Sequence, residues 1–272
     1  MENYSVLISV YYKEKADFFR EAMMSIANQT IKSNDVVLVC DGPLTEELEA
    51  VIQEMLIVFG ENLTIYRLKK NVGLGNALNH GLGKCKNELV ARMDSDDISL
   101  PNRIEMQLKL FQKQPELSVI SGNVNEFIDT PEIITGTRKL PKDNYQIIKF
   151  SKLRNPFNHP AVMFKKTAVE TVGGYSERFP LFEDYYLWNR MLMKGYIGTN
   201  IQEPIVLMRV PFDLYLRRGG IKYAKYSLDI YIWMLKIGWI GFLEFFTALI
   251  PRLIICVLPN KLRALIYNFI HV

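Results

Sequence analysis

The sequence predicts an α/β fold in which a mainly parallel central sheet is flanked by helices. Four short apolar segments, rich in β-branched residues, are expected to be strands: Ser5–Val10, Val36–Cys40, Leu63–Leu68 and Glu88–Met93. Stretches with helical periodicity separate them, and strands that alternate with helices are typical of a parallel sheet. No repeat and no Ser/Gly/Pro-rich linker divides the 272 residues, so we expect one α/β domain with an appendage.

Helices are expected where a capping residue precedes an apolar periodic stretch. Asp17 is predicted to cap a helix that runs through Ile26, and Thr45 to cap a second one. Further helices are expected at Leu74–Lys84, Pro101–Phe111 and Glu183–Lys194. Two more strands are expected at Ser118–Phe127 and Pro160–Phe164, and residues 129–158 are expected to be loop-rich.

The three cysteines, Cys40, Cys85 and Cys256, are scattered and form no C-x-x-C pair. This pattern argues against a disulfide framework or a zinc site and favours a reducing compartment. The first residues lack a basic segment ahead of their short apolar run, which favours a strand over a signal peptide.

The C-terminal segment is apolar, aromatic and basic. From Arg217 onward it carries eight basic and two acidic residues. Charges at Lys236, Glu244 and Arg252 interrupt the apolar stretch before it reaches the roughly 20 residues that a membrane span needs. We therefore expect amphipathic helices that lie on a membrane surface, with core or dimer packing as the alternative. Nucleic acid is not expected as a partner, because the basic residues flank very apolar stretches.

The parallel sheets of α/β folds bind ligands at the carboxyl ends of their strands. This rule singles out four segments: Tyr11–Glu14, Asp41-Gly42, Lys70–Gly75 and Asp94–Asp97. The last of these, Asp94-Ser95-Asp96-Asp97, places three carboxylates within four positions. Unpaired, they would repel one another, so the pattern predicts a site for Mg²⁺ or Mn²⁺. The alternative is a solvated turn.

Two other motifs have both a functional and a structural interpretation. The glycines of Asn71-Val72-Gly73-Leu74-Gly75 could let a helix begin close to a phosphate or ribose, or simply form a helix-entry turn. The Glu183-Asp184 pair begins a predicted helix, where acids favour the helix dipole. Its aromatic neighbours indicate partial burial, which can raise the pKa of a carboxyl group toward that of a general base.

Several stretches resemble the family 2 glycosyltransferases of the GT-A fold over roughly residues 4–220. They are the segment Ala91–Ile98 followed by Pro101, Arg103 and Gln107, the segment Asn155–Met163, Gly173-Gly174-Tyr175 ahead of Glu183-Asp184, and Arg217-Arg218-Gly219-Gly220. They look most similar to bacterial enzymes that extend lipid-linked O-antigen or exopolysaccharide repeat units.

The resemblance implies a role for each matching position. Asp184 would be the catalytic base, Asp96 the main metal ligand, and Asp94 a ligand of the ribose or the metal. Asp41 would contact the uracil, and the nucleotide-sugar site would also include Tyr11, Glu14, Asn71, Gly73 and Ser95. The acceptor or its diphosphate would meet His159, Glu183, Arg217 and Arg218. Two departures touch the nucleotide pocket: Cys40 precedes Asp41 and Tyr12 follows Tyr11, where many relatives have an acid and an asparagine.

The activity so implied is inverting, metal-dependent transfer of a hexose, galactose or glucose, from a UDP-sugar. The acceptor would be a polyprenyl-diphosphate-linked sugar and the product a β-1,3 linkage, made at the cytoplasmic face of the bacterial inner membrane. Residues 1–220 would form the catalytic domain, with a nucleotide-binding half (1–100) and an acceptor half (101–220), and residues 221–272 the membrane-associating segment. The alternatives are a metal-dependent nucleotidyltransferase and a non-catalytic membrane scaffold.

Overall fold

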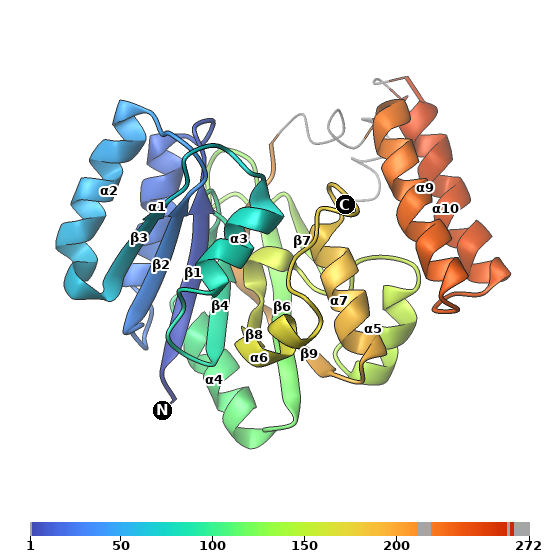
Figure 1. The fold of residues 1–272 in the computed structure, drawn as a ribbon, viewed down its shortest axis with the longest axis horizontal. Coiled ribbons are helices and arrows are strands. Elements are labelled where there is room, and N and C mark those ends of the chain that lie inside the picture. The colour runs from blue at the N-terminus through green and yellow to red at the C-terminus, as the bar shows by residue number, and fades with distance from the viewer. Residues whose placement is uncertain (1, 212–218, 260–261, 264–272) are drawn as a thin grey trace.

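The computed structural model describes residues 2–211, 219–259 and 262–263, and its centre is a single mixed sheet (Figure 1). The first half contributes four parallel strands: β1 (Tyr4–Val10), β2 (Asp35–Cys40), β3 (Leu63–Arg67) and β4 (Leu89–Met93). Their order in the sheet is β3-β2-β1-β4. Every residue of β2 and β4 is buried, as expected for strands that helices cover on both faces.

The second half extends the same sheet with strands of both directions. Beyond β4 the order is β8-β6-β9-β5, where β8 (Met163–Lys165) runs antiparallel to both β4 and β6 (Leu117–Phe127). The long strand β9 (Ile197–Arg209) lies parallel to β6 and antiparallel to the short β5 (Ile98–Ser99). β7 (Gly136–Arg138) pairs with β6 at the sheet's margin.

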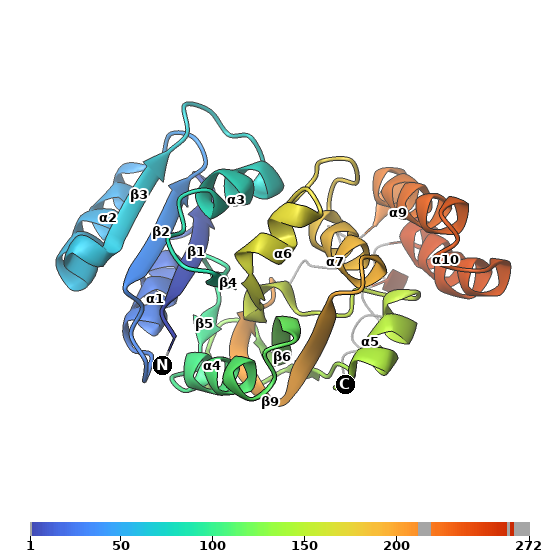
Figure 2. The ribbon, with the colours of Figure 1, turned by 60° about the horizontal axis from the view of Figure 1, so that its bottom comes forward.

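Helices cover both faces and give three layers (Figure 2). On one face, α1 (Ala16–Ala27), α2 (Glu46–Phe59) and α4 (Arg103–Lys113) pack their apolar sides into one buried cluster. On the other face, α3 (Leu74–Leu82), α5 (Asn144–Ser151), α6 (Lys166–Thr171) and α7 (Glu183–Met193) form a second cluster. Short 3₁₀ turns occupy Gly60–Asn62 and His159–Ala161.

Most expected elements are present, but two predictions were wrong. Asp17 does not cap α1; Lys15 holds that position, and Asp17 instead pairs with Arg20 within the first turn. The strand expected at Pro160–Phe164 begins only at residue 163, because the 3₁₀ turn takes up residues 159–161. The segment 129–158 is loop-rich, as expected, and it also contains β7 and α5, the latter capped by Asp143. Thr45 does cap α2, accepting a hydrogen bond from the Leu48 amide.

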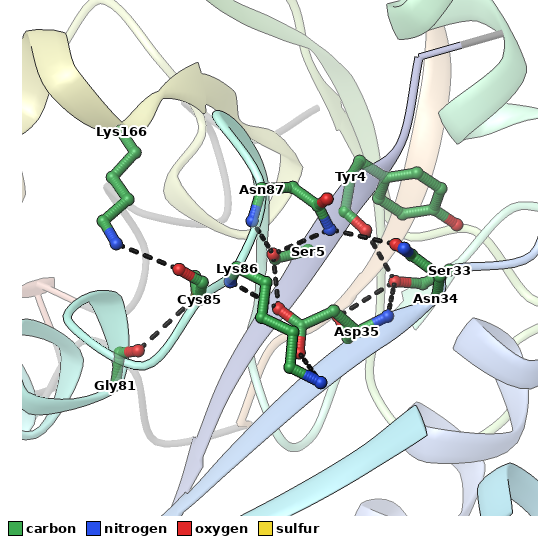
Figure 3. Close-up of polar contacts among 10 residues, drawn as sticks. All are labelled: Tyr4, Ser5, Ser33, Asn34, Asp35, Gly81, Cys85, Lys86, Asn87 and Lys166. Atoms are coloured by element: carbon green, nitrogen blue, oxygen red, sulfur yellow. Dashed lines mark hydrogen bonds and ion pairs between the residues drawn. The ribbon is translucent and has the colours of Figure 1, made fainter. Parts of the chain in front are cut away.

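A polar cluster ties the connection before β4 to the N-terminal ends of β1 and β2, at the opposite ends of these strands from the acidic turn (Figure 3). The buried Asp35 carboxylate accepts hydrogen bonds from the Ser5 hydroxyl (2.6 Å) and the Lys86 amide (2.8 Å). Asn87 in turn donates from its backbone and side chain to the Ser5 oxygen. These bonds fix where β4 enters the sheet, and so help to place the turn at its far end.

The chain ends in a helical pair, α9 (Gly220–Lys236) and α10 (Phe242–Val257), which lies beside α7 at one end of the molecule in both ribbon views (Figures 1 and 2). Aromatic residues of α7 and the loop before it share a buried cluster with α9 and α10, including Tyr186, Tyr231 and Leu249. Among the described residues, no helix combines the length and apolar character needed to cross a bilayer. The division at residue 220 stays a prediction.

Candidate active site

Three carboxylates gather on the turn that follows β4. Asp94, Asp96 and Asp97 each offer an oxygen, and these oxygens lie within 4.8 Å of one another. The turn is short because β5 begins at Ile98 and pairs with β9, so the acids remain close together. Oxygen ligands at this spacing suit a hard divalent cation such as Mg²⁺ or Mn²⁺.

The electrostatics of the cluster favour a bound cation. Burial, then the nearby Asp94 and Glu14, raise the pKa of Asp96 from 3.8 to about 7. Burial and the neighbouring Asp96 and Asp94 raise the pKa of Asp97 well above its usual range. Repulsion of this kind disappears when a cation joins the carboxylates. Asp97 also has a structural partner, because it accepts a hydrogen bond from the Arg209 amide at the end of β9 (2.7 Å).

A buried arginine holds the first aspartate of the cluster. Arg92 lies within β4 and is 1% exposed, and both terminal nitrogens of its guanidinium donate to the two oxygens of Asp94, one at 2.7 Å. A bidentate pair fixes the plane of the carboxylate as well as its position. Arg92 therefore sets the direction in which Asp94 presents its remaining lone pairs.

The predicted nucleotide-sugar residues form two linked groups at the same edge of the sheet. Both Asp41 oxygens accept backbone amide hydrogens, from Val72 (2.7 Å) and Gly73 (3.1 Å), and the Asn71 side chain donates to the Asp41 carbonyl (3.2 Å). Gly73 has φ of 87° and forms the N-cap of α3, a backbone conformation that favours glycine. Asp41 thus holds the helix-entry loop, and its contact with a uracil stays a prediction.

The second group joins the end of β1 to the acidic turn. The Ser95 hydroxyl donates to the Glu14 carboxylate (2.7 Å), and the Glu14 amide donates to the Tyr11 carbonyl in a tight turn (3.0 Å). Tyr11 itself is 40% exposed. The role of Tyr11 in nucleotide-sugar binding stays a prediction.

Asp184 lies in the first turn of α7 and is half-buried. The Asn155 side chain donates to one oxygen (2.6 Å) and the Tyr185 amide to the other (2.7 Å). Burial raises the pKa of Asp184 above its usual value, while these two hydrogen bonds act in the opposite direction. A carboxylate that is positioned by two donors and made more basic by burial has the properties of a general base.

The residues predicted to meet the acceptor or its diphosphate do not all lie beside Asp184 in the cavity. Glu183 lies against Gly75 at the start of α3 and is not among the described residues that line the cavity described below. His159 Nε2 lies 2.9 Å from the Tyr175 hydroxyl. Burial keeps the pKa of His159 well below its usual range, so the ring is neutral. Arg217 and Arg218 lie outside the described residues.

A cavity of about 640 Å³ connects the acidic turn with the C-terminal helices. Asp94, His159 and Asp184 line it, together with Tyr223 of α9 and Arg252 of α10. Its size is that of a ligand site. The structure therefore brings Asp94 of the acidic turn and the predicted base to one cavity, and adds lining residues that lie far from them in sequence.

Two residues that position the site received no role in the sequence analysis. Arg92 has a signal, because a charged residue inside an otherwise apolar strand must have a partner. Asn155 has none beyond the motif that contains it, since its contact with Asp184 spans 29 residues and depends on how α5 and α7 pack.

Known proteins are similar to this chain over most of its length. Residues 5–173 match the sequence profile described as Glycosyl transferase family 2. The chain belongs to this family. It is 39% identical over 265 residues, 97% of this chain and 95% of the relative, to the UDP-Gal:alpha-D-GlcNAc-diphosphoundecaprenol beta-1,3-galactosyltransferase of Escherichia coli. It is 35% identical to the amylovoran biosynthesis glycosyltransferase AmsE of Erwinia amylovora, with 97% of this chain and 98% of the relative covered.

Solved structures confirm the predicted GT-A fold of this family 2 glycosyltransferase. The mannosyltransferase PcManGT of Pyrobaculum calidifontis, in complex with GDP-Man and Mn²⁺, superposes with a TM-score of 0.65 at 18% identity, covering 99% of this chain and 74% of that one. Residues 1–349 of S. aureus TarS, in complex with UDP-GlcNAc, give a TM-score of 0.66 at 15% identity, with 86% and 66% covered. At these identities the likeness concerns the fold alone.

Proposed function

We propose that this family 2 enzyme transfers galactose from UDP-galactose to an N-acetylglucosamine that is linked through a diphosphate to a polyprenyl lipid, forming a β-1,3 bond. The observation that carries the proposal is the cavity lined by both Asp94, on the acidic turn, and Asp184, the carboxylate proposed as the base. The donor and acceptor are those in the name of the E. coli relative, which aligns with 97% of this chain. Glucose is the second candidate donor.

The donor would lie along the edge formed by the ends of β1, β2 and β4. Asp94 and Asp96 would hold a Mg²⁺ or Mn²⁺ ion, and their carboxylate oxygens fit such an ion in type and spacing. When bound, the cation neutralises charge on the departing nucleoside diphosphate. Tyr11, Glu14, Asp41, Asn71, Gly73 and Ser95 would form the rest of the nucleotide-sugar site.

Asp184 would act on the acceptor. Its carboxylate takes the proton from the acceptor hydroxyl as that oxygen bonds to the anomeric carbon, while the bond from this carbon to the diphosphate oxygen breaks and UDP leaves. A single displacement inverts the configuration, so an α-linked donor gives a β-linked product. Asn155 and the Tyr185 amide hold the base in place through the step.

A lipid-linked acceptor implies work at a membrane surface, and the outer side of α10 supports this part of the proposal. Phe242, Leu243 and Val257 are each at least 69% exposed, which is unusual for large apolar side chains on a soluble surface. From Arg217 to the end the chain has a net charge of +6 by composition, against −2 for the rest. Apolar and basic groups together favour peripheral attachment to anionic lipid, here at the cytoplasmic face of the bacterial inner membrane.

The test is transfer in vitro with a panel of UDP-sugars and a synthetic acceptor in which GlcNAc is linked through a diphosphate to an alkyl chain. We expect transfer from UDP-galactose, dependence on Mg²⁺ or Mn²⁺, and a β-1,3 linkage by NMR. Asp184→Asn should lower kcat by about 10²–10⁴, whereas Asp17→Asn, on an exposed helix face, should not. Transfer that proceeds unchanged in chelator, or a fully active Asp184→Asn enzyme, would refute the proposed mechanism.

A further inference from the structure

The cavity that contains Asp184 has a basic wall, to which neither the motifs nor the family profile assigns a role. Lys139, Arg154 and Arg252 line it, together with Arg138, whose charge is balanced by an ion pair with Glu126. The only acidic residues among the described lining are Asp94 and Asp184. Cationic side chains therefore outnumber carboxylates along the described lining.

The three cations come from separate parts of the chain. Lys139 directly follows β7, Arg154 follows α5 in a turn where its amide donates to the Phe150 carbonyl (2.9 Å), and Arg252 lies in the middle of α10. Convergence of three elements on one cavity is unlike the scattered charges of a solvated surface.

Arg252 is the best positioned of the three. One of its nitrogens donates to the Ala248 carbonyl one turn earlier (2.6 Å), and its guanidinium lies 5.2 Å from the ring of the buried Tyr231. These contacts hold the stem of the side chain while it remains half-buried at the cavity wall. The same wall contains Ile255 and Tyr223, so apolar surface adjoins the charge.

We propose that Lys139, Arg154 and Arg252 form the subsite for the acceptor's diphosphate, with the adjoining apolar wall of α9 and α10 receiving the first part of the lipid. The inference rests on the proposed function and deepens it. An acceptor whose sugar hydroxyl meets Asp184 must place its diphosphate elsewhere in the same cavity, which Lys139, Arg154 and Arg252 also line. Guanidinium groups suit such a ligand because they bind phosphate oxygens in pairs.

The diphosphates of the donor and of the acceptor would be bound in different ways. Both ligands contain a diphosphate, yet the donor's would be held through a cation on carboxylates, and the acceptor's directly by positive side chains. Chelator should therefore abolish binding of the first and spare binding of the second. This difference lets the two sites be measured separately.

The experiment is direct binding of an alkyl diphosphate that lacks any sugar, measured by calorimetry on the full chain in EDTA. We expect saturable binding that weakens as salt is raised. Arg252→Gln and Arg154→Gln should each weaken it about tenfold to a hundredfold, the usual loss for a hydrogen bond to a charged group. Arg252→Lys, which keeps the charge, should lose less, and Lys139→Gln should weaken binding where Lys113→Gln, on the exposed end of α4, should not.

An activity measurement separates this proposal from the proposed function. With acceptors that differ only in carrying a diphosphate, a monophosphate or no phosphate, the wild type should prefer the diphosphate through KM. The glutamine variants should lose that preference while keeping the KM for UDP-sugar. If the variants bind the alkyl diphosphate as tightly as the wild type does, the subsite is refuted, whatever sugar is transferred. If binding behaves as expected but no sugar is transferred, the proposed function fails and the subsite stands.

Discussion

The raised pKa of Asp96 leads to a quantitative prediction about cation binding. A cation binds the ionised carboxylate, and with a pKa of about 7 the group is roughly one tenth ionised at pH 6 and roughly nine tenths at pH 8. The apparent affinity for Mg²⁺ should therefore rise about tenfold between these pH values, which is about 1.4 kcal/mol. Binding at pH 6 should also release close to one proton per ion, on the order of 0.9.

The raised pKa of Asp96 also affects the free energy of unfolding when no cation is bound. Because the folded-state pKa lies above the ordinary value of 3.8, the folded protein binds a proton that the unfolded chain lacks between about pH 4 and pH 7. The contribution of Asp96 to the free energy of unfolding should fall as pH rises through this window. Saturating Mg²⁺ should offset the loss, so the thermal shift that it produces should be larger at pH 8 than at pH 6.

Calorimetry at the two pH values, in buffers of different ionisation enthalpy, measures both affinity and proton release. Thermal unfolding with and without Mg²⁺ measures the effect on stability. Asp96→Asn should remove the pH dependence along with most of the binding, and Asp17→Asn should leave both unchanged. Equal affinity at pH 6 and pH 8 in the wild type, without proton release, would show that Asp96 does not titrate against the cation.

Three further predictions concern the base and the scaffold. Asn155→Ala removes a donor to the Asp184 carboxylate, which should raise the pKa of that group and move the acidic limb of the kcat/KM profile to higher pH; an unmoved limb would argue against Asp184 as the base. Asp35→Ala should lower the free energy of unfolding by roughly 2–4 kcal/mol, measured by urea denaturation, because it leaves buried donors unpaired (Figure 3), whereas Asp17→Ala should cost less than about 0.5 kcal/mol. Gly81→Ala should destabilise by about 1–3 kcal/mol in the same assay, despite alanine's helix propensity, since a Cβ there would lie within 2.6 Å of side chains on β1 and β2; a more stable variant would contradict this packing.

The first half of the fold could be predicted because its signals are local. Each of the four parallel strands is a short apolar stretch, and Thr45 caps α2 as its position indicates. The acidic cluster could likewise be predicted, since its three members lie within four residues at a strand end. A general rule about parallel sheets then placed it at the ligand edge.

The second half was harder because long-range pairing decides its structure. β9 is the longest strand, yet it contains polar residues and Pro204, and it exists through pairing with β6 and β5. Within the loop-rich segment 129–158, α5 and β7 were not predicted because α5 is only two turns long and β7 only three residues. For the same reason, the contact between Asn155 and Asp184 and the basic wall of the cavity have no local sequence signal. Both depend on how α5, α7 and α10 come together.

The buried aromatic cluster between α7 and the C-terminal helices has a practical consequence for anyone who would shorten this protein. Phe179, Phe182 and Tyr186 share a buried hydrophobic cluster with Ile230, Tyr231 and Met234 of α9. A truncated protein that ends before α9 would therefore expose these aromatic side chains to solvent. The helix concerned begins with Glu183-Asp184, and its first turn would lose part of its support. Removing α9 and α10 should therefore destabilise the catalytic body as well as weaken the proposed membrane attachment.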